Sequence, residues 1–254
     1  MILMRRWNDA IGNRMVRDTP HQKGTRVPIF YDNEGDDSCR PQAFVVEQAP
    51  NWVLRQHYHG VHQFQVVSAG AGSIGRHQVA PLIVHYSSPE SGYGPITAGP
   101  EGLSYYTLRA NPDPQTRYLP ESKPLMQKGL VRQHGMTPPI DPSGPATSSV
   151  SGATREGEPF VSLLQGHRDS AAVWRLDLRA GEVFEASRLP GRGPRYYLVA
   201  AGGLATGGGL LESGSVVFTH DEPGFSLAAG PDGLTVLAMQ FPVEAVVGQS
   251  GGGH

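Results

Sequence analysis

Short apolar runs separated by turn-forming residues are the main pattern along this chain. The runs are rich in Val, Leu, Tyr and Phe, and clusters of Gly, Pro and Asp lie between them. This spacing is typical of an antiparallel β sandwich or barrel, so we predict an all-β protein. We expect strands at residues 64–68, 82–86, 104–109, 173–178, 196–200, 215–219 and 234–241.

The chain also resembles itself. AGPEGL at 98–103 recurs as AGPDGL at 229–234, and QFQVVSAGAGSIG at 63–75 aligns with RYYLVAAGGLATG at 195–207. The two blocks keep nearly the same separation in both copies, which indicates a duplicated β module of about 80–100 residues. We interpret the two AGP blocks as turns between strands that need the backbone freedom of glycine.

The repeat and the composition suggest five segments. We expect an N-terminal arm at 1–44, a first lobe at 45–110 and a linker rich in Pro, Ser and Gly at 111–157. A second lobe at 158–243 and a flexible tail at 244–254 follow. Within the arm, a short amphipathic helix would place Ile2, Leu3, Trp7 and Ile11 on one side, and residues 125–131 could form a turn of helix.

Composition and charge exclude several function classes. The formal net charge of −2 gives no electrostatic reason to expect nucleic acid or an anionic membrane as a partner. The single cysteine cannot form an intrachain disulfide, and we see neither a secretory signal nor an apolar run long enough to span a membrane. We therefore expect a cytoplasmic protein that acts on a small molecule.

The segment 57–70 carries the main candidate chemistry. On a strand, side chains at i and i+2 share a face, so His57 and His59 point the same way. A tight turn after them would bring Gln63 opposite the pair. Two imidazoles and a third donor on one face form a candidate site for a divalent metal.

This segment resembles the first motif of the cupin superfamily, which is His-x-His, three residues, Glu, six residues and Gly. His57, His59, position 63 and Gly70 match that spacing. With the repeat, the chain is similar to a bicupin, which implies two tandem cupin-type barrels of the double-stranded β-helix or jelly-roll kind. The resemblance also implies two histidine ligands, a carboxylate ligand, a third histidine from a Pro-x-Gly-x-x-His motif, and a homodimer.

The sequence departs from that motif pattern twice. Position 63 is Gln in place of Glu, so a neutral carbonyl oxygen stands where the family has an anion. The stretch 95–106, PITAGPEGLSYY, has no histidine at the second motif. The remaining ligand is left open between His77, His85 and a tyrosine.

Strand alternation selects further site residues. If Gln63 faces inward, Gln65 also does, and His62 faces the other side. Gln65 is a candidate for orienting the substrate, and Tyr105 or Tyr106 could project into the barrel, one in the core and the other in the cavity. Arg109, with Arg55 and Arg76, is expected to form salt bridges.

The second copy lacks the histidine pair. Leu189 and Gly191 stand in place of His57 and His59, and Arg195 stands in place of Gln63. An arginine cannot ligate a metal, so we expect one site per chain. We favour a structural role for Arg195, possible partners being Glu182 and Glu185, over the binding of an organic anion.

Three functions are compatible with these observations. The first is a metal-dependent cupin enzyme, an Fe(II) oxygenase acting on a small anionic or enolisable molecule, with Mn, Ni or Zn as alternative metals. The second is a metal-dependent isomerase or lyase that uses a His or Tyr as acid or base. The third is a non-catalytic module that binds or senses a small molecule.

Overall fold

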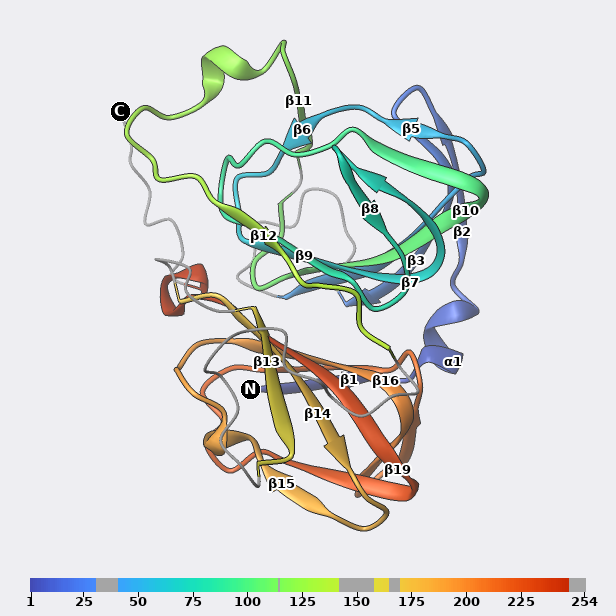
Figure 1. Cartoon of the computed structure of the whole chain (residues 1–254), viewed down its shortest axis with the longest axis vertical. Helices are drawn as coiled ribbons and strands as arrows, with labels where there is room; N and C mark the ends of the chain where they lie inside the picture. Colours follow the sequence, from blue (N-terminus) through green and yellow to red (C-terminus); the bar gives the residue numbers. More distant parts are fainter. Residues whose placement is uncertain (31–40, 114, 142–157, 165–169, 247–254) are drawn as a thin grey trace.

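The computed structural model describes residues 1–30, 41–113, 115–141, 158–164 and 170–246, and this part of the chain is nearly all β. The strands form two lobes, drawn one above the other in Figure 1. The first lobe is mainly blue to green and the second mainly orange to red, so each lobe corresponds to one copy of the sequence repeat. The predicted all-β class and tandem barrel lobes are confirmed.

The first lobe is a mixed set of long and short antiparallel strands. Its main sheet has the order β12-β9-β7-β10-β4-β3-β2, with β5 paired to β10 and β8 paired to β7, and a separate small ladder joins β11 to β6. The strands are β2 (Met15–Thr19), β3 (Gln22–Phe30), β4 (Gln42–Gln48), β5 (Val53–Leu54), β6 (His57–Tyr58), β7 (Gln63–Ile74), β8 (His77–Val79), β9 (Val84–Ser87), β10 (Ile96–Arg109), β11 (Arg117–Tyr118) and β12 (His134–Met136).

The second lobe repeats the same plan. Its order is β1-β18-β16-β19-β14-β13, with β15 paired to β19 and β17 paired to β16. The strands are β1 (Ile2–Arg5), β13 (Phe160–Leu164), β14 (Ala172–Leu178), β15 (Val183–Glu185), β16 (Arg195–Thr206), β17 (Gly209–Glu212), β18 (Val216–Thr219) and β19 (Ser226–Gln240).

The two AGP blocks lie inside long strands and do not connect strands, which corrects our expectation. AGPEGL belongs to β10 and AGPDGL to β19, and the pairing register shifts at both places. Gly102 and Gly233 adopt φ of 84° and 79°, a region that favours glycine. Both blocks are therefore β-bulges, which bend a strand and let one strand serve two parts of a barrel.

The N-terminal segment is built into both sheets and does not form a separate arm. Residues 2–5 are a strand that pairs with β18 of the second lobe, Leu3 lying opposite Phe218. The predicted amphipathic helix is therefore wrong over these residues, and only α1 (Trp7–Ile11) is helical. The free edge of β18 supplies backbone partners that an isolated helix would lack. β2 and β3 then join the sheet of the first lobe.

Alternating side chains place one shared core between the lobes and one core inside each lobe. Phe64 of β7 packs against Phe241 with ring centroids 4.8 Å apart, while its neighbours Gln63 and Gln65 face the interior of the first lobe. The hydroxyl of Tyr196 donates to the main-chain oxygens of Gln42 and Arg109 across the lobe interface. The faces of β7 predicted from period-2 alternation are confirmed.

The segment expected as a linker also contributes structure. β12 pairs with β9, and β11 pairs with β6. The predicted turn of helix over 125–131 is replaced by a 3-10 turn, η1 (Lys123–Leu125); two further 3-10 turns are η2 (Ala186–Arg188) and η3 (Val243–Val246). Residues 142–157 of the linker and 247–254 of the tail lie outside the described residues. None of the described helices has the length and apolar character that crossing a bilayer requires.

Candidate functional site

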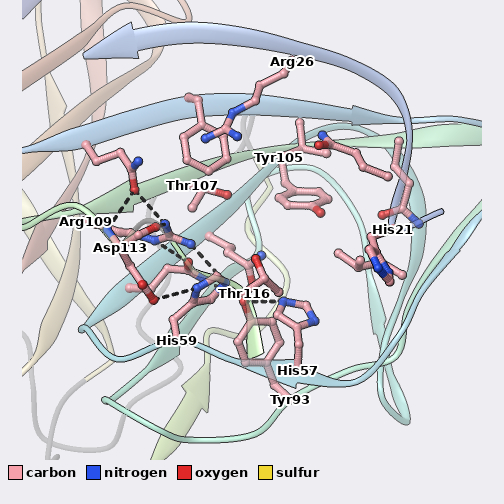
Figure 2. A pocket seen from close by; sticks show the side chains of 18 of the residues that line it. His21, Arg26, His57, His59, Tyr93, Tyr105, Thr107, Arg109, Asp113 and Thr116 are labelled. Carbon is pink, nitrogen blue, oxygen red and sulfur yellow. Dashed lines mark hydrogen bonds and ion pairs between the residues drawn. The ribbon is translucent and has the colours of Figure 1, made fainter. Parts of the chain in front are cut away.

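A cavity of about 130 Å³ lies inside the first lobe, with the predicted histidines on its wall. Successive inward positions of neighbouring strands supply the lining, Gln63 and Gln65 from β7 and Tyr105, Thr107 and Arg109 from β10. Figure 2 shows these side chains converging from the surrounding strands. The other lining residues are His21, Gln22, Arg26, Gln42, Phe44, Val46, Gln48, Trp52, Leu54, His57, His59, Tyr93, Asp113, Thr116 and Tyr118.

His57 and His59 are both buried, and each ring is held by a hydrogen bond at Nδ1. His57 Nδ1 donates to the main-chain oxygen of Arg55 at 2.7 Å, and its Nε2 accepts from the hydroxyl of Tyr93 at 3.0 Å. His59 Nδ1 lies 2.9 Å from Oδ2 of Asp113 and donates to it. These contacts fix the tautomer of both rings, with the lone pair on Nε2.

The guanidinium of Arg109 is the central group of the site. Its Nε donates to Oε1 of Gln63 at 2.8 Å, and its Nη2 donates to Nε2 of His59 at 3.0 Å. Nη1 donates to Oε1 of Gln42 at 2.7 Å and to the main-chain oxygen of Asp113 at 3.2 Å. These bonds appear as dashed lines in Figure 2. Our expectation of a salt-bridge role did not place this arginine inside the cavity.

Burial and the arginine keep the histidines neutral. Burial lowers the pKa of His57 to about 4, and the charge of Arg109 acts in the same direction. The pKa of His59 is lowered to about 3 by burial and Arg109, although its bond to Asp113 opposes this change. Burial alone would raise the pKa of the Asp113 carboxyl, but the His59 hydrogen bond and Arg109 outweigh it and hold that pKa well below its usual range.

The cupin resemblance implies a metal ion held by His57 and His59. The lone pairs of His57 and His59 already accept hydrogen bonds from Tyr93 and Arg109, and the carbonyl of Gln63 accepts another from Arg109. A guanidinium is permanently charged and would repel a second cation at this distance. Within the described residues, no group of three or more His, Cys, Asp or Glu is arranged to hold a metal. The site as folded does not fit a divalent metal, because the arginine takes the place of the cation.

The second lobe has the same pair of residue types on the opposite strands. By the repeat, Gln63 on β7 matches Arg195 on β16, and Arg109 on β10 matches Gln240 on β19. Arg195 Nε and Nη2 donate to Oε1 of Gln240 at 3.0 and 2.8 Å, and Nη2 also donates to the main-chain oxygens of residues 189–191. Each lobe therefore has one guanidinium and one amide at this place, with the two strands exchanged.

This arrangement supports the structural role expected for Arg195. Its donors go to Gln240 and to main-chain oxygens, and neither Glu182 nor Glu185 is among its hydrogen-bond partners. The segment of the second lobe that matches His57 to His59 contributes carbonyl groups to the arginine. In the first lobe, the corresponding acceptor for Arg109 is Nε2 of His59.

The other predicted site residues divide between the two faces of their strands. Gln65 lines the cavity, and its carbonyl accepts a hydrogen bond from His85 Nδ1 at 3.0 Å. Tyr105 lines the cavity, whereas Tyr106 packs in the core between the lobes and donates to the main-chain oxygen of Gly214. Tyr106 is therefore removed from the candidate site, since adjacent residues of a strand face opposite sides. His62 lies outside the cavity lining, as expected.

Sequence reasoning missed Tyr93, Asp113 and the role of Arg109. Asp113 follows β10 and reaches His59 from a segment that we expected to be a linker. Tyr93 lies in a loop and contacts both His57 and Gln63. Neither position has a spacing signal relative to the histidines. The alternation Tyr105, Thr107, Arg109 could have placed the arginine inward.

Comparison with known proteins identifies the fold. No protein-family model and no curated protein matches the chain. Solved structures do match. A bacterial pirin from Escherichia coli in complex with nickel(II) is 14% identical, with 96% of this chain and 100% of that chain covered and a TM-score of 0.50.

Two further structures have higher TM-scores. A protein from Nostoc punctiforme described as a candidate dioxygenase is 12% identical, covering 96% of this chain and 84% of that one, with a TM-score of 0.59. Oxalate decarboxylase from Bacillus subtilis, an enzyme with Mn(II) centres, is 13% identical, covering 96% and 77%, with a TM-score of 0.56. All three have the cupin fold, and some are bicupins. The chain therefore has the cupin fold in two tandem copies, with the cavity in the first.

Proposed function

We propose that the first-lobe cavity binds a small organic carboxylate that also carries a hydroxyl group, without a metal ion on His57 and His59. Polar and charged side chains supply much of the lining. The guanidinium groups of Arg26 and Arg109 and the carboxylate of Asp113 are among them. The guanidinium of Arg26 lies 3.5 Å from the ring centroid of Phe44 on the cavity wall.

Two buried polar atoms carry the proposal, because they indicate where such a ligand would make hydrogen bonds. Nε1 of Trp52 is a donor and Oε1 of Gln48 is an acceptor, and both are buried without a partner among the described residues. An unpaired buried polar group costs about 1–3 kcal/mol, which a bound ligand could recover. A carboxylate would accept from Trp52, and a hydroxyl would donate to Gln48.

The remaining wall suits a small, partly apolar molecule. Phe44, Tyr105 and Tyr118 contribute aromatic surface. The cavity is smaller than those that usually hold drug-sized ligands. Arg109 would act mainly by its positive charge, since its donors already bind Gln63, Gln42 and His59.

Calorimetry with matched ligands tests this function. Lactate and mandelate carry both groups, propionate and phenylacetate lack the hydroxyl, and 2-propanol and benzyl alcohol lack the carboxylate. We expect at least one hydroxy acid to bind about tenfold more tightly than both of its analogues, or about 1.4 kcal/mol per missing group. Trp52→Phe should lower that affinity about fivefold while keeping the aromatic ring, and Tyr118→Phe should not. Equal binding of all three members in both series contradicts the proposal.

A metal-dependent enzyme, an Fe(II) oxygenase or a metal-dependent isomerase or lyase, is the second candidate function. It is favoured by the nickel(II) complex of the pirin and the Mn(II) centres of oxalate decarboxylase. Elemental analysis of protein purified without chelators separates the two functions. We expect less than 0.1 metal ion per chain and hydroxy-acid binding that is indifferent to added Fe(II), Mn(II) or Ni(II). A stoichiometric metal lost in His57→Ala, together with oxygen uptake, would favour the second function.

A further inference from the structure

The ring of Tyr93 lies between the first cavity and a groove beside it. Tyr93 is 5% exposed, and among the described residues it alone lines both spaces. Its ring centroid lies 4.6 Å from that of His57, on the cavity wall, and 5.0 Å from that of His85, on the groove wall. Figure 2 shows Tyr93 next to His57. The two spaces therefore meet at this ring.

The groove leads from the surface to the interior of the first lobe. Its exposed rim is polar and carries Gln56, Arg76, His77, Gln78 and His134. Its inner end is buried, since His85 is 2% exposed. His85 on β9 pairs with Gln65 on β7, and its Nδ1 donates to the carbonyl of Gln65 at 3.0 Å. Because Gln65 lines the cavity and His85 lines the groove, a single layer of side chains divides the two spaces.

Two hydrogen bonds hold the Tyr93 ring in this position. Its hydroxyl donates to Nε2 of His57 at 3.0 Å and accepts from Nε2 of Gln63 at 2.7 Å. Both partners are themselves fixed, because His57 Nδ1 donates to the main-chain oxygen of Arg55 and the Gln63 carbonyl accepts from Arg109. The hydroxyl therefore positions the ring, and the ring occupies the space between cavity and groove.

Tyr93 lies at the end of the cavity away from the unpaired acceptor of the proposed function. Gln48 is the last residue of β4, and Gln42, the first, accepts a hydrogen bond from Arg109. Gln63, which donates to Tyr93, also accepts from Arg109. A ligand whose hydroxyl binds Gln48 would therefore extend its chain toward the Tyr93 end.

We infer that Tyr93 determines how long a ligand the first cavity accepts, because its ring closes the cavity toward the groove. The inference rests on the proposed function and narrows its ligand class to short hydroxy acids. Tyr93 is a specificity-determining residue in this role. Loss of the ring should join the cavity to the groove and remove the limit on chain length, whereas loss of the hydroxyl alone should not.

Calorimetry with two pairs of hydroxy acids tests the inference. Lactate and 2-hydroxyoctanoate form one pair, and mandelate and 4-butylmandelate form the other. In a pair whose short member binds, we expect the wild type to bind that member at least tenfold more tightly than the long one. Tyr93→Ala should reduce this ratio to less than threefold, because the chain of the long acid can pass position 93. Tyr93→Phe should keep the wild-type ratio, because the ring remains.

Tyr105→Leu is the matched control, since Tyr105 lines the cavity but not the groove. It should keep a ratio of at least tenfold, although it enlarges the cavity. Tyr93→Leu covers the case in which Tyr93→Ala does not fold, and should lower the ratio at least threefold.

Three results would overturn the inference alone: a wild type that binds the short acids without a length preference, an unchanged ratio in the Tyr93 variants that lack the ring, or an equal loss of the ratio in Tyr105→Leu. Failure of the wild type to bind either lactate or mandelate would refute the proposed function, and the inference with it.

Discussion

Arg109 is a buried cation whose partners are mostly neutral. It donates to two amide oxygens, an imidazole nitrogen and a main-chain oxygen, and Asp113 supplies a negative charge on the far side of His59. A buried charge is tolerated only where its donors are satisfied. The hydrogen bonds of Gln42 and Gln63 are therefore as much a part of the site as the histidines are.

Removal of this guanidinium should destabilise the protein measurably. Arg109→Met removes the guanidinium donors that bind Oε1 of Gln42, Oε1 of Gln63 and Nε2 of His59. We expect the free energy of unfolding to fall by about 3 kcal/mol, measured by urea denaturation. Arg109→Lys should lower the free energy of unfolding by a smaller amount, because an ammonium keeps the charge. It should still fall below the wild type, because an ammonium cannot form the same set of hydrogen bonds. Wild-type stability in Arg109→Met would show that the network contributes nothing.

The same variant should gain affinity for metal. Without the guanidinium, the lone pair of His59 is released beside that of His57, whose ring centroid lies 5.4 Å away. We expect Arg109→Met to bind Ni(II) at least tenfold more tightly than the wild type by calorimetry. The double variant with His57→Ala is the control and should lose that gain. An unchanged Ni(II) affinity would show that the arginine is not what keeps a cation out.

Stability should fall as the pH drops below about 6.5. His57, His59 and His85 have folded pKa values of about 4, 3 and 3, all below the unfolded value near 6.5. The unfolded chain therefore binds more protons between these values, so the free energy of unfolding decreases as pH falls through that window. Each histidine contributes on the order of 1 kcal/mol per pH unit.

Urea denaturation at pH 7, 6 and 5 measures this dependence. His85→Met should reduce the change in unfolding free energy per pH unit by about a third, because one of the three buried histidines is removed. His134→Gln, at an exposed position, serves as the control and should leave the slope as it is. Equal unfolding free energies at pH 7 and pH 5 would contradict the assignment of neutral buried rings.

At the scale of elements, β10 and β19 each bend at a glycine bulge. Leu103 and Leu234 resume regular pairing after the bulge, so one long strand pairs with different partners before and after it. In the first lobe this bend leads into Tyr105, Thr107 and Arg109, which line the cavity. The position of the arginine thus depends on the bulge as well as on the alternation.

Substitution of either bulge glycine by alanine should lower the free energy of unfolding. A Cβ at Gly102 would lie 2.9 Å from the main-chain oxygen of Gln48, and one at Gly233 would lie 2.9 Å from that of Leu178. Gly129 has a similar φ of 78°, with nothing within 4 Å of an added Cβ. We expect Gly129→Ala to cost about 1 kcal/mol and each bulge variant about 2–3 kcal/mol in urea denaturation. Equal losses of unfolding free energy at all three glycines would mean that the positive φ alone, and not the close main-chain oxygen, causes the destabilisation.

At the scale of the whole molecule, the N-terminus joins the two lobes. β1 completes the second sheet, and the chain then passes through α1 into β2 of the first. Trp7 contacts Tyr106, with ring centroids 6.1 Å apart, and the shared core lies beside them. The lobes are therefore expected to fold as one unit, although the homodimer expected from the resemblance stays a prediction.

Deletion of residues 1–6 tests this dependence. It removes β1 and exposes the backbone of β18, an edge that can pair with another chain. We expect a lower melting temperature, a single calorimetric transition and concentration-dependent aggregation seen by light scattering. Met4→Ala, at an exposed β1 position, is the control and should melt close to the wild type. Two separate transitions in the wild type would contradict cooperative folding of the lobes.

The sequence by itself determined the all-β class, the duplication and the faces of β7. These are local properties, since strand alternation and turn-forming residues act over a few positions and the repeat can be read directly. It also placed His57, His59 and Gln65 in one cavity, because they lie on alternating positions or match a spaced motif, and it left the choice between Tyr105 and Tyr106 open.

Only the tertiary structure decided what the histidines bind. Arg109 lies 50 residues from His59 and Asp113 lies 54 residues from it, so no local pattern links them. The same holds for β1, which pairs with a strand more than 200 residues away. Strand pairing and barrel closure bring such groups together. They place the guanidinium of Arg109 in the cavity where the motif predicted a metal ion.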